Sequence, residues 1–206
     1  MTHVKICGVR SADDARACVD LGASAIGLNF VASSPRCVTT AEALAIARAV
    51  HEMAREAIVV GVVANMSVDA MRALVADAEL DCLQLHGDEP PELLSALLPH
   101  AYKAVRVGSA DDVARARAYP GEHLLVDAKV DGALGGTGAT FDWSLVKALA
   151  RERRLTLAGG LDPGNVARAV REIAPYCVDV ASGVERAPGV KDLAKVEAFI
   201  EAARAG

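Results

Sequence analysis

The residues that could carry chemistry stand where short apolar runs end. Cys7 closes the run HVKIC, and Asp127 closes the run HLLVD. An ionised thiol can accept a proton when a nearby charge lowers its pKa, whereas burial among apolar side chains raises the pKa of a carboxyl group so that it can donate one. The residue types alone leave two plain alternatives open: a cysteine that only fills space, and an aspartate that caps a helix or forms a salt bridge.

Two glycine-rich segments could bind an anion. They read LAGGLDPGNV over 157–166 and ASGVERAPGVKD over 181–192, and each follows an apolar run. Glycine lets backbone N–H groups converge on a phosphate, and the positive end of a short helix adds to the attraction. Either segment alone would be interpreted as a tight turn with positive φ angles. Because the two segments follow consecutive runs, phosphate binding is the favoured interpretation.

Arg36 and His86 are further candidates for binding a ligand. Arg36 follows a proline in SSPRC, and its planar guanidinium group suits a carboxylate, although a solvated surface arginine would have the same context. His86, in LQLHGDE, could donate a hydrogen bond or carry a proton. The five cysteines form no C-x-x-C pair and no Cys/His cluster at zinc spacing, so we expect chemistry without a metal ion.

The elements that must position these residues alternate along the chain. Eight short runs rich in β-branched residues start at positions 3, 25, 58, 82, 101, 123, 155 and 178. Between them, apolar residues recur at intervals of three and four. This spacing predicts helices over 11–21, 41–53, 68–78, 91–98, 111–118, 143–151, 165–173 and 191–203. Ser11, Ser67 and Asp142 indicate helix starts.

Strict alternation of strands and helices predicts a parallel sheet, because each helix supplies a crossover between parallel strands. We expect an α/β protein with a closed (βα)8 TIM barrel that forms a single domain over residues 1–206. An open doubly wound sheet is the alternative, but the first strand-to-helix turn, CGVRS, lacks the G-x-G-x-x-G pattern. In a barrel, Cys7, His86, Asp127 and Asp179 would meet at one mouth. The segment over 131–143 could be a lid for that mouth or a loop without a role.

Composition and charge argue against several classes of protein. Hydrophobic residues make up 52% of the chain, and the formal net charge is −5 with Lys and Arg residues scattered along it. Nucleic acid and anionic membranes are therefore not expected as partners. No apolar run is long enough for a secretory signal or a membrane span, so we expect a cytoplasmic protein. Whether it is a monomer or a homodimer stays open.

Taken together, these motifs resemble the phosphoribosylanthranilate isomerase family of tryptophan biosynthesis. The matching segments run in family order over essentially the whole chain. They are KICG at 5, SPR at 34, LQLHG at 83, LLVD at 124, GGTG and FDW between 135 and 143, LAGGLDPGNV at 157 and VDVASGVERAPGVKD at 178. Any one of these segments alone would be a weak signal, and their joint order makes the resemblance strong.

The resemblance implies a (βα)8 barrel that converts N-(5-phosphoribosyl)anthranilate into 1-(2-carboxyphenylamino)-1-deoxyribulose 5-phosphate by an Amadori rearrangement, without a cofactor. It implies Cys7 as the general base and Asp127 as the general acid. It also implies Arg36 for the anthranilate carboxylate, His86 and Asp179 as substrate contacts, and Gly159, Gly160, Ser182 and Gly183 for the phosphate. Two alternatives stay open: a histidine-pathway phosphosugar isomerase, which pairs two aspartates, and a non-catalytic barrel that only binds a phosphoribosyl ligand.

Overall fold

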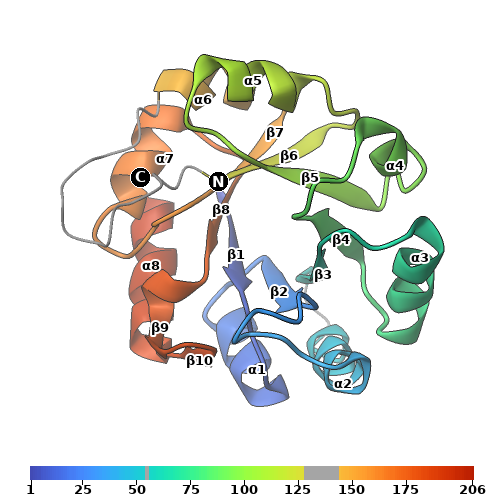
Figure 1. Cartoon of the computed structure of the whole chain (residues 1–206). Helices are drawn as coiled ribbons and strands as arrows, with labels where there is room; N and C mark the ends of the chain where they lie inside the picture. The colour runs from blue at the N-terminus through green and yellow to red at the C-terminus, as the bar shows by residue number, and fades with distance from the viewer. Residues whose placement is uncertain (54–55, 128–143) are drawn as a thin grey trace.

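A closed barrel of eight parallel strands forms the centre of the molecule (Figure 1). This computed structural model describes residues 1–53, 56–127 and 144–206. The strands pair in chain order, and the last barrel strand closes the sheet by pairing with the first. They are β1 (His3–Cys7), β2 (Ala25–Asn29), β3 (Ile58–Val63), β4 (Cys82–Leu85), β5 (Ala101–Arg106), β6 (His123–Asp127), β7 (Arg154–Ala158) and β8 (Cys177–Val180). The predicted (βα)8 barrel is confirmed.

Helices surround the barrel on its outside (Figure 1). They are α1 (Ala12–Asp20), α2 (Thr40–His51), α3 (Val68–Asp77), α4 (Pro91–Ser95), α5 (Ala110–Arg117), α6 (Ser144–Glu152), α7 (Val166–Ile173) and α8 (Leu193–Ala205). Each overlaps one predicted helix. After β8 the chain adds a 3-10 turn, η1 (Ser182–Val184), and a hairpin of β9 (Glu185–Ala187) and β10 (Val190–Lys191), which the sequence did not predict. None of the described helices has both the length and the apolar character of a membrane span.

Side-chain caps fix where several helices begin. The hydroxyl oxygens of Ser11 and Ser67 each accept a hydrogen bond from a backbone N–H three residues further along the chain. These bonds satisfy donors that the first helical turn leaves without a partner, and they confirm both predicted starts. The third predicted cap, Asp142, and the predicted lid over 131–143 lie outside the described residues.

Alternation along the strands separates two apolar clusters. Val4 and Ile6 belong to the larger cluster, which lies between the sheet and the helices. A smaller cluster that includes Leu125 fills the inside of the barrel. Lys5 and Cys7 alternate with Val4 and Ile6 along β1, so they point into the barrel. Lys5 is only 2% exposed, and the inside of the barrel therefore contains a buried charge as well as apolar side chains.

Candidate active site

The carboxyl ends of the barrel strands surround a cavity of about 350 Å³. All but one of the predicted site residues line it: Cys7, Arg36, His86, Asp127, Gly159, Gly160, Asp179 and Ser182. Gly183 is the exception, because it packs directly against the backbone oxygen of Leu161, where an added Cβ would collide. The two glycine segments therefore pack closely together at Gly183, and phosphate binding by Gly183 stays a prediction.

Cys7 ends β1 inside the mouth, with 9% of its surface exposed. Gly27 on the neighbouring strand leaves room for the thiol, because a Cβ at that position would lie 2.8 Å from Sγ. Burial raises the pKa of the Cys7 thiol, and the positive charges of Lys5 and Lys191 lower it only in part. Positive charge lies near the thiol, as a reactive cysteine needs, but it lowers the pKa of the thiol by less than burial raises it.

Lys5 lies two residues before Cys7 and was missed as a site residue. Its Nζ donates to Oε1 of Gln84 at 2.9 Å and to Oδ1 of Asp179 at 3.1 Å. Burial acts to lower the pKa of Lys5, but the Asp179 carboxylate and other nearby groups hold that pKa well above its ordinary value. A positive charge is therefore fixed beside the thiol. The sequence feature that could have identified Lys5 is a lysine inside an apolar strand. It lies two residues from Cys7, so both side chains are on the same face of the sheet.

Arg36 reaches the cavity with one edge of its guanidinium group already paired. Its Nε and Nη2 donate to the Glu185 carboxylate at 2.8 and 2.6 Å. Glu185 also accepts from Nζ of Lys191 at 3.0 Å, and Lys191 donates to the backbone oxygen of Cys7 at 2.6 Å. This network fixes the direction of Arg36. Among the described residues none bonds to Nη1 on the other edge, so that edge could meet a second carboxylate. Sequence reasoning missed Glu185 and Lys191.

His86 follows β4 and lies between two cavities. Its Nδ1 is 3.1 Å from Nε2 of Gln84. Burial lowers the pKa of His86, and the negative charge of Asp127 opposes this effect in part. The imidazole is therefore neutral near pH 7. His86 and Asp127 also line a neighbouring cavity of about 620 Å³, which Arg106 and Tyr119 border.

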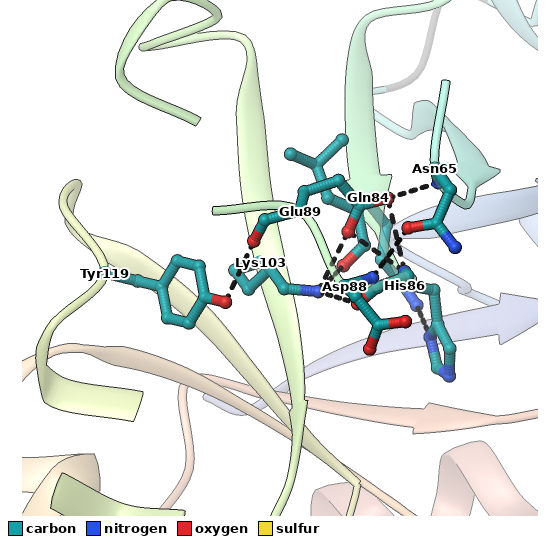
Figure 2. Close-up of polar contacts among 9 residues, drawn as sticks. Asn65, Gln84, His86, Asp88, Glu89, Lys103 and Tyr119 are labelled. Atoms are coloured by element: carbon teal, nitrogen blue, oxygen red, sulfur yellow. Dashed lines mark hydrogen bonds and ion pairs between the residues drawn. The ribbon is translucent and has the colours of Figure 1, made fainter. Parts of the chain in front are cut away.

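A buried ion pair holds the loop that carries His86 (Figure 2). Nζ of Lys103 lies 3.0 Å from Oε2 of Glu89 and 2.6 Å from the backbone oxygen of Gly87. Glu89 also accepts from the backbone N–H of Asn65 at 2.7 Å. The two charged side chains are 3% and 1% exposed. These contacts join three parts of the chain: the end of β3, the loop that follows β4, and strand β5. The backbone of His86 is therefore held in place.

The glycine segment after β7 has a conformation that favours glycine. Gly159 and Gly160 have φ angles of +95° and +66°. The side chain of Asn165 donates to the backbone oxygen of Gly160 at 2.9 Å and so holds the turn. A Cβ at Gly160 would meet nothing within 4 Å. The segment and the Ser182 side of the β8 loop line one wall of the cavity, as an anion site requires.

Cys7 and Asp127 lie on separated strands, since β7 and β8 stand between β6 and β1 in the closed order. Both residues nevertheless line the same cavity. A ligand that fills it can therefore touch a thiol and a carboxyl group at once. Over the ranges 1–53, 56–127 and 144–206, no three Asp, Glu, His or Cys side chains converge as a metal site would need.

The whole chain is similar to known phosphoribosylanthranilate isomerases. The family model described as N-(5'phosphoribosyl)anthranilate (PRA) isomerase matches residues 4–202. An N-(5'-phosphoribosyl)anthranilate isomerase from Myxococcus xanthus is 46% identical in an alignment of 206 positions. The alignment covers 98% of this chain and 96% of that protein.

Solved structures agree with the sequence comparisons. The crystal structure of phosphoribosyl anthranilate isomerase from Thermotoga maritima has a TM-score of 0.89 at 37% identity, with 99% of both chains covered. A second crystal structure of such an isomerase, in complex with reduced 1-(o-carboxyphenylamino)-1-deoxyribulose 5-phosphate, has a TM-score of 0.86 at 35% identity and the same coverage. The chain belongs to the N-(5'-phosphoribosyl)anthranilate isomerase family.

Proposed function

We propose that this chain isomerises N-(5'-phosphoribosyl)anthranilate to 1-(2-carboxyphenylamino)-1-deoxyribulose 5-phosphate by an Amadori rearrangement. The proposal is carried by one observation: a single cavity brings Cys7, Asp127, Arg36 and two glycines with positive φ together in a member of this family. The substrate has matching parts, because it carries a carboxylate at one end, a phosphate at the other and a furanose ring between them.

Asp127 acts first, as the general acid. It donates a proton to the ring oxygen of the furanose, the bond between C1 and that oxygen breaks, and the nitrogen lone pair forms a C1=N⁺ bond. Asp127 is left as a carboxylate. Its place at the end of an apolar strand, half-buried beside the cavity, supports this role.

Cys7 acts second, as the general base. The positive nitrogen makes the C2 proton acidic, and the thiolate removes it while the C–H electron pair forms a C1=C2 bond and neutralises the nitrogen. The resulting enolamine becomes the ketone when C1 gains a proton and the C2 hydroxyl loses one. Each positioned proton transfer contributes about 10² to 10⁴ in rate. The Lys5 charge supports the thiolate.

Both ends of the substrate are held so that C1 and C2 lie between the acid and the base. The Nη1 edge of Arg36 binds the anthranilate carboxylate, while Nε and Nη2 stay on Glu185. Gly159, Gly160 and Ser182 bind the phosphate, and Gly183 contributes by packing the two glycine segments together. His86 contacts the ribosyl part, and Asp179 acts mainly through Lys5.

The fluorescence of freshly prepared phosphoribosylanthranilate tests this function. The chain should accelerate the loss of the anthranilate-type signal far beyond the spontaneous background. A barrel that only binds the ligand would give no acceleration, and a histidine-pathway isomerase would instead turn over its own aminoaldose, which should be assayed in parallel. Either of those results would refute the proposal.

Several finer points stay predictions. We propose that the reaction needs neither a metal ion nor a cofactor, so dialysis against a chelator should leave kcat unchanged. We also expect one domain over residues 1–206, a monomer or a homodimer, no nucleic-acid or membrane partner, and a cytoplasmic location.

A further inference from the structure

A hydrogen-bonded chain runs beneath the mouth from Lys5 through Gln84 to His86. Nζ of Lys5 and the hydroxyl group of Tyr102 donate to Oε1 of Gln84 at 2.9 and 3.1 Å. Nε2 of the same amide lies 3.1 Å from Nδ1 of His86, a contact that Figure 2 shows. Lys5, Gln84 and Tyr102 are at most 3% exposed, so water does not compete for these bonds.

The donors at one end fix the direction of the Gln84 amide. The Lys5 ammonium group has three donors and no acceptor, so only the amide oxygen can face it. A reversed amide would place its NH₂ group against the ammonium group and leave buried donors without partners, which is costly in the barrel interior. The NH₂ group therefore faces His86 and donates to Nδ1.

We propose that Gln84 is a positioning residue: it fixes His86 as the tautomer protonated at Nε2, and this N–H donates to an oxygen on the ribosyl part of the substrate. A neutral imidazole carries one N–H, so a Nδ1 atom that accepts a hydrogen bond leaves the proton on Nε2. His86 lines the same cavity as Cys7 and Asp127. The hydrogen bond from Nε2 to the substrate rests on the proposed function, whereas the tautomer of His86 does not.

The surroundings of His86 favour a neutral and immobile ring. Burial lowers the pKa of His86 more than any charge shifts it. The charged groups that act on the ring are Asp127 and Asp179, which favour protonation, and Lys103 and Lys5, which oppose it. The loop beneath the ring is held by Lys103 and its ion pair, so the N–H keeps one direction when the ligand arrives.

Long-range ¹H–¹⁵N NMR of the histidine rings tests the tautomer in the wild-type protein without any substrate. The chain has five histidines, and the signal that disappears in a His86→Asn variant identifies the ring. Near pH 7 we expect a proton-bearing Nε2 and an acceptor-type Nδ1. A proton on Nδ1, or comparable amounts of both tautomers, would overturn the assignment. If the tautomer is found but the wild type does not turn over the isomerase substrate, only the function has failed.

Gln84→Glu tests the role in catalysis. A carboxylate still accepts from Lys5 and Tyr102 but can only accept from Nδ1, so the proton should move to Nδ1 and Nε2 should lose its donor. We expect kcat/KM at pH 8 to fall about tenfold, as for the loss of one oriented hydrogen bond. At lower pH the ring becomes an imidazolium ion and regains the Nε2 N–H, so the deficit should shrink.

A deficit that is constant with pH, or that grows as the pH falls, would contradict a positioning role. Growth at low pH would instead mean that the added carboxylate acts on the Cys7 thiol. The thermal midpoint of Gln84→Glu should be measured alongside. If this variant does not fold, Gln84→Met provides the second test, because without the amide the NMR should show both His86 tautomers.

Discussion

Replacing Lys5 with methionine removes the buried positive charge beside Cys7 while keeping a side chain of similar length. Asp179, which is 8% exposed, then loses its ion-pair partner, and Gln84 loses one of its donors. Removal of one partner from a buried ion pair costs about 3–5 kcal/mol. The free energy of unfolding of Lys5→Met should fall by this order, as measured by urea denaturation.

The same substitution should raise the pKa of the Cys7 thiol further, because Lys5 is the strongest of the groups that lower it. One pKa unit corresponds to about 1.36 kcal/mol and to a tenfold lower thiolate fraction at a pH well below the pKa. Since the base must be ionised, kcat/KM of the wild type should rise with pH towards the pKa of the thiol. In Lys5→Met this rise should move to higher pH, and kcat/KM at pH 7 should fall about tenfold for each unit by which the pKa of the thiol rises.

The rate at which iodoacetamide alkylates Cys7 measures the ionisation of the thiol directly. The rate of modification of the Cys7 peptide, followed by mass spectrometry over a range of pH, should show a higher apparent pKa in Lys5→Met than in the wild type. Asp179→Asn is the matched control, because it breaks the same ion pair and should also lower stability. Asp179 raises the pKa of the Cys7 thiol, so its removal should shift the titration to lower pH. Equal shifts in one direction, or no shift in either variant, would refute the reasoning.

The remaining predictions concern the general acid, the arginine that binds the anthranilate carboxylate, and the glycine segments that bind the phosphate. Asp127→Asn should lower kcat by about 10² to 10⁴ in the fluorescence assay, because the ring oxygen loses its proton donor; full activity would exclude Asp127 as the acid. Arg36→Met should raise KM more than it lowers kcat, because it removes the hydrogen bond to the anthranilate carboxylate of the substrate. An unchanged KM would disqualify that contact. Gly183→Ala should push the two glycine segments apart, because its Cβ would collide with the backbone oxygen of Leu161. It should weaken binding of inorganic phosphate, measured by calorimetry, and unaltered binding would contradict the assigned role.

The fold and the place of most candidate site residues could be predicted from the sequence because strand ends are local features. An apolar run that stops at Cys7 or Asp127 marks both a strand and its carboxyl end. Parallel pairing in a closed barrel then brings all such ends to one mouth. The eight barrel strands followed from short β-branched runs, and the approximate helix ranges followed from apolar residues spaced three and four apart. Neither pattern needs knowledge of distant contacts.

Contacts between distant parts of the chain were not predictable in this way. Glu185 stands in a glycine- and proline-rich segment whose composition predicts only a phosphate loop, yet it orients Arg36 across 149 residues of sequence. Lys191 reaches the backbone oxygen of Cys7 across 184 residues. Such pairings depend on how the loop after β8 folds over the mouth, and periodicity carries no information about that. The raised pKa of the Cys7 thiol likewise follows from burial in the assembled barrel.

The activity and ligand affinity of Cys7→Ser test most directly whether a thiolate and a carboxyl group act on one bound substrate. A serine hydroxyl has nearly the size of the thiol but is a very weak base at neutral pH. If Cys7 is the general base, kcat falls by about 10² to 10⁴, while the Kd for the reduced product analogue stays close to the wild-type value. A Cys7→Ser variant that turns over the substrate at nearly the wild-type rate would contradict this role of Cys7.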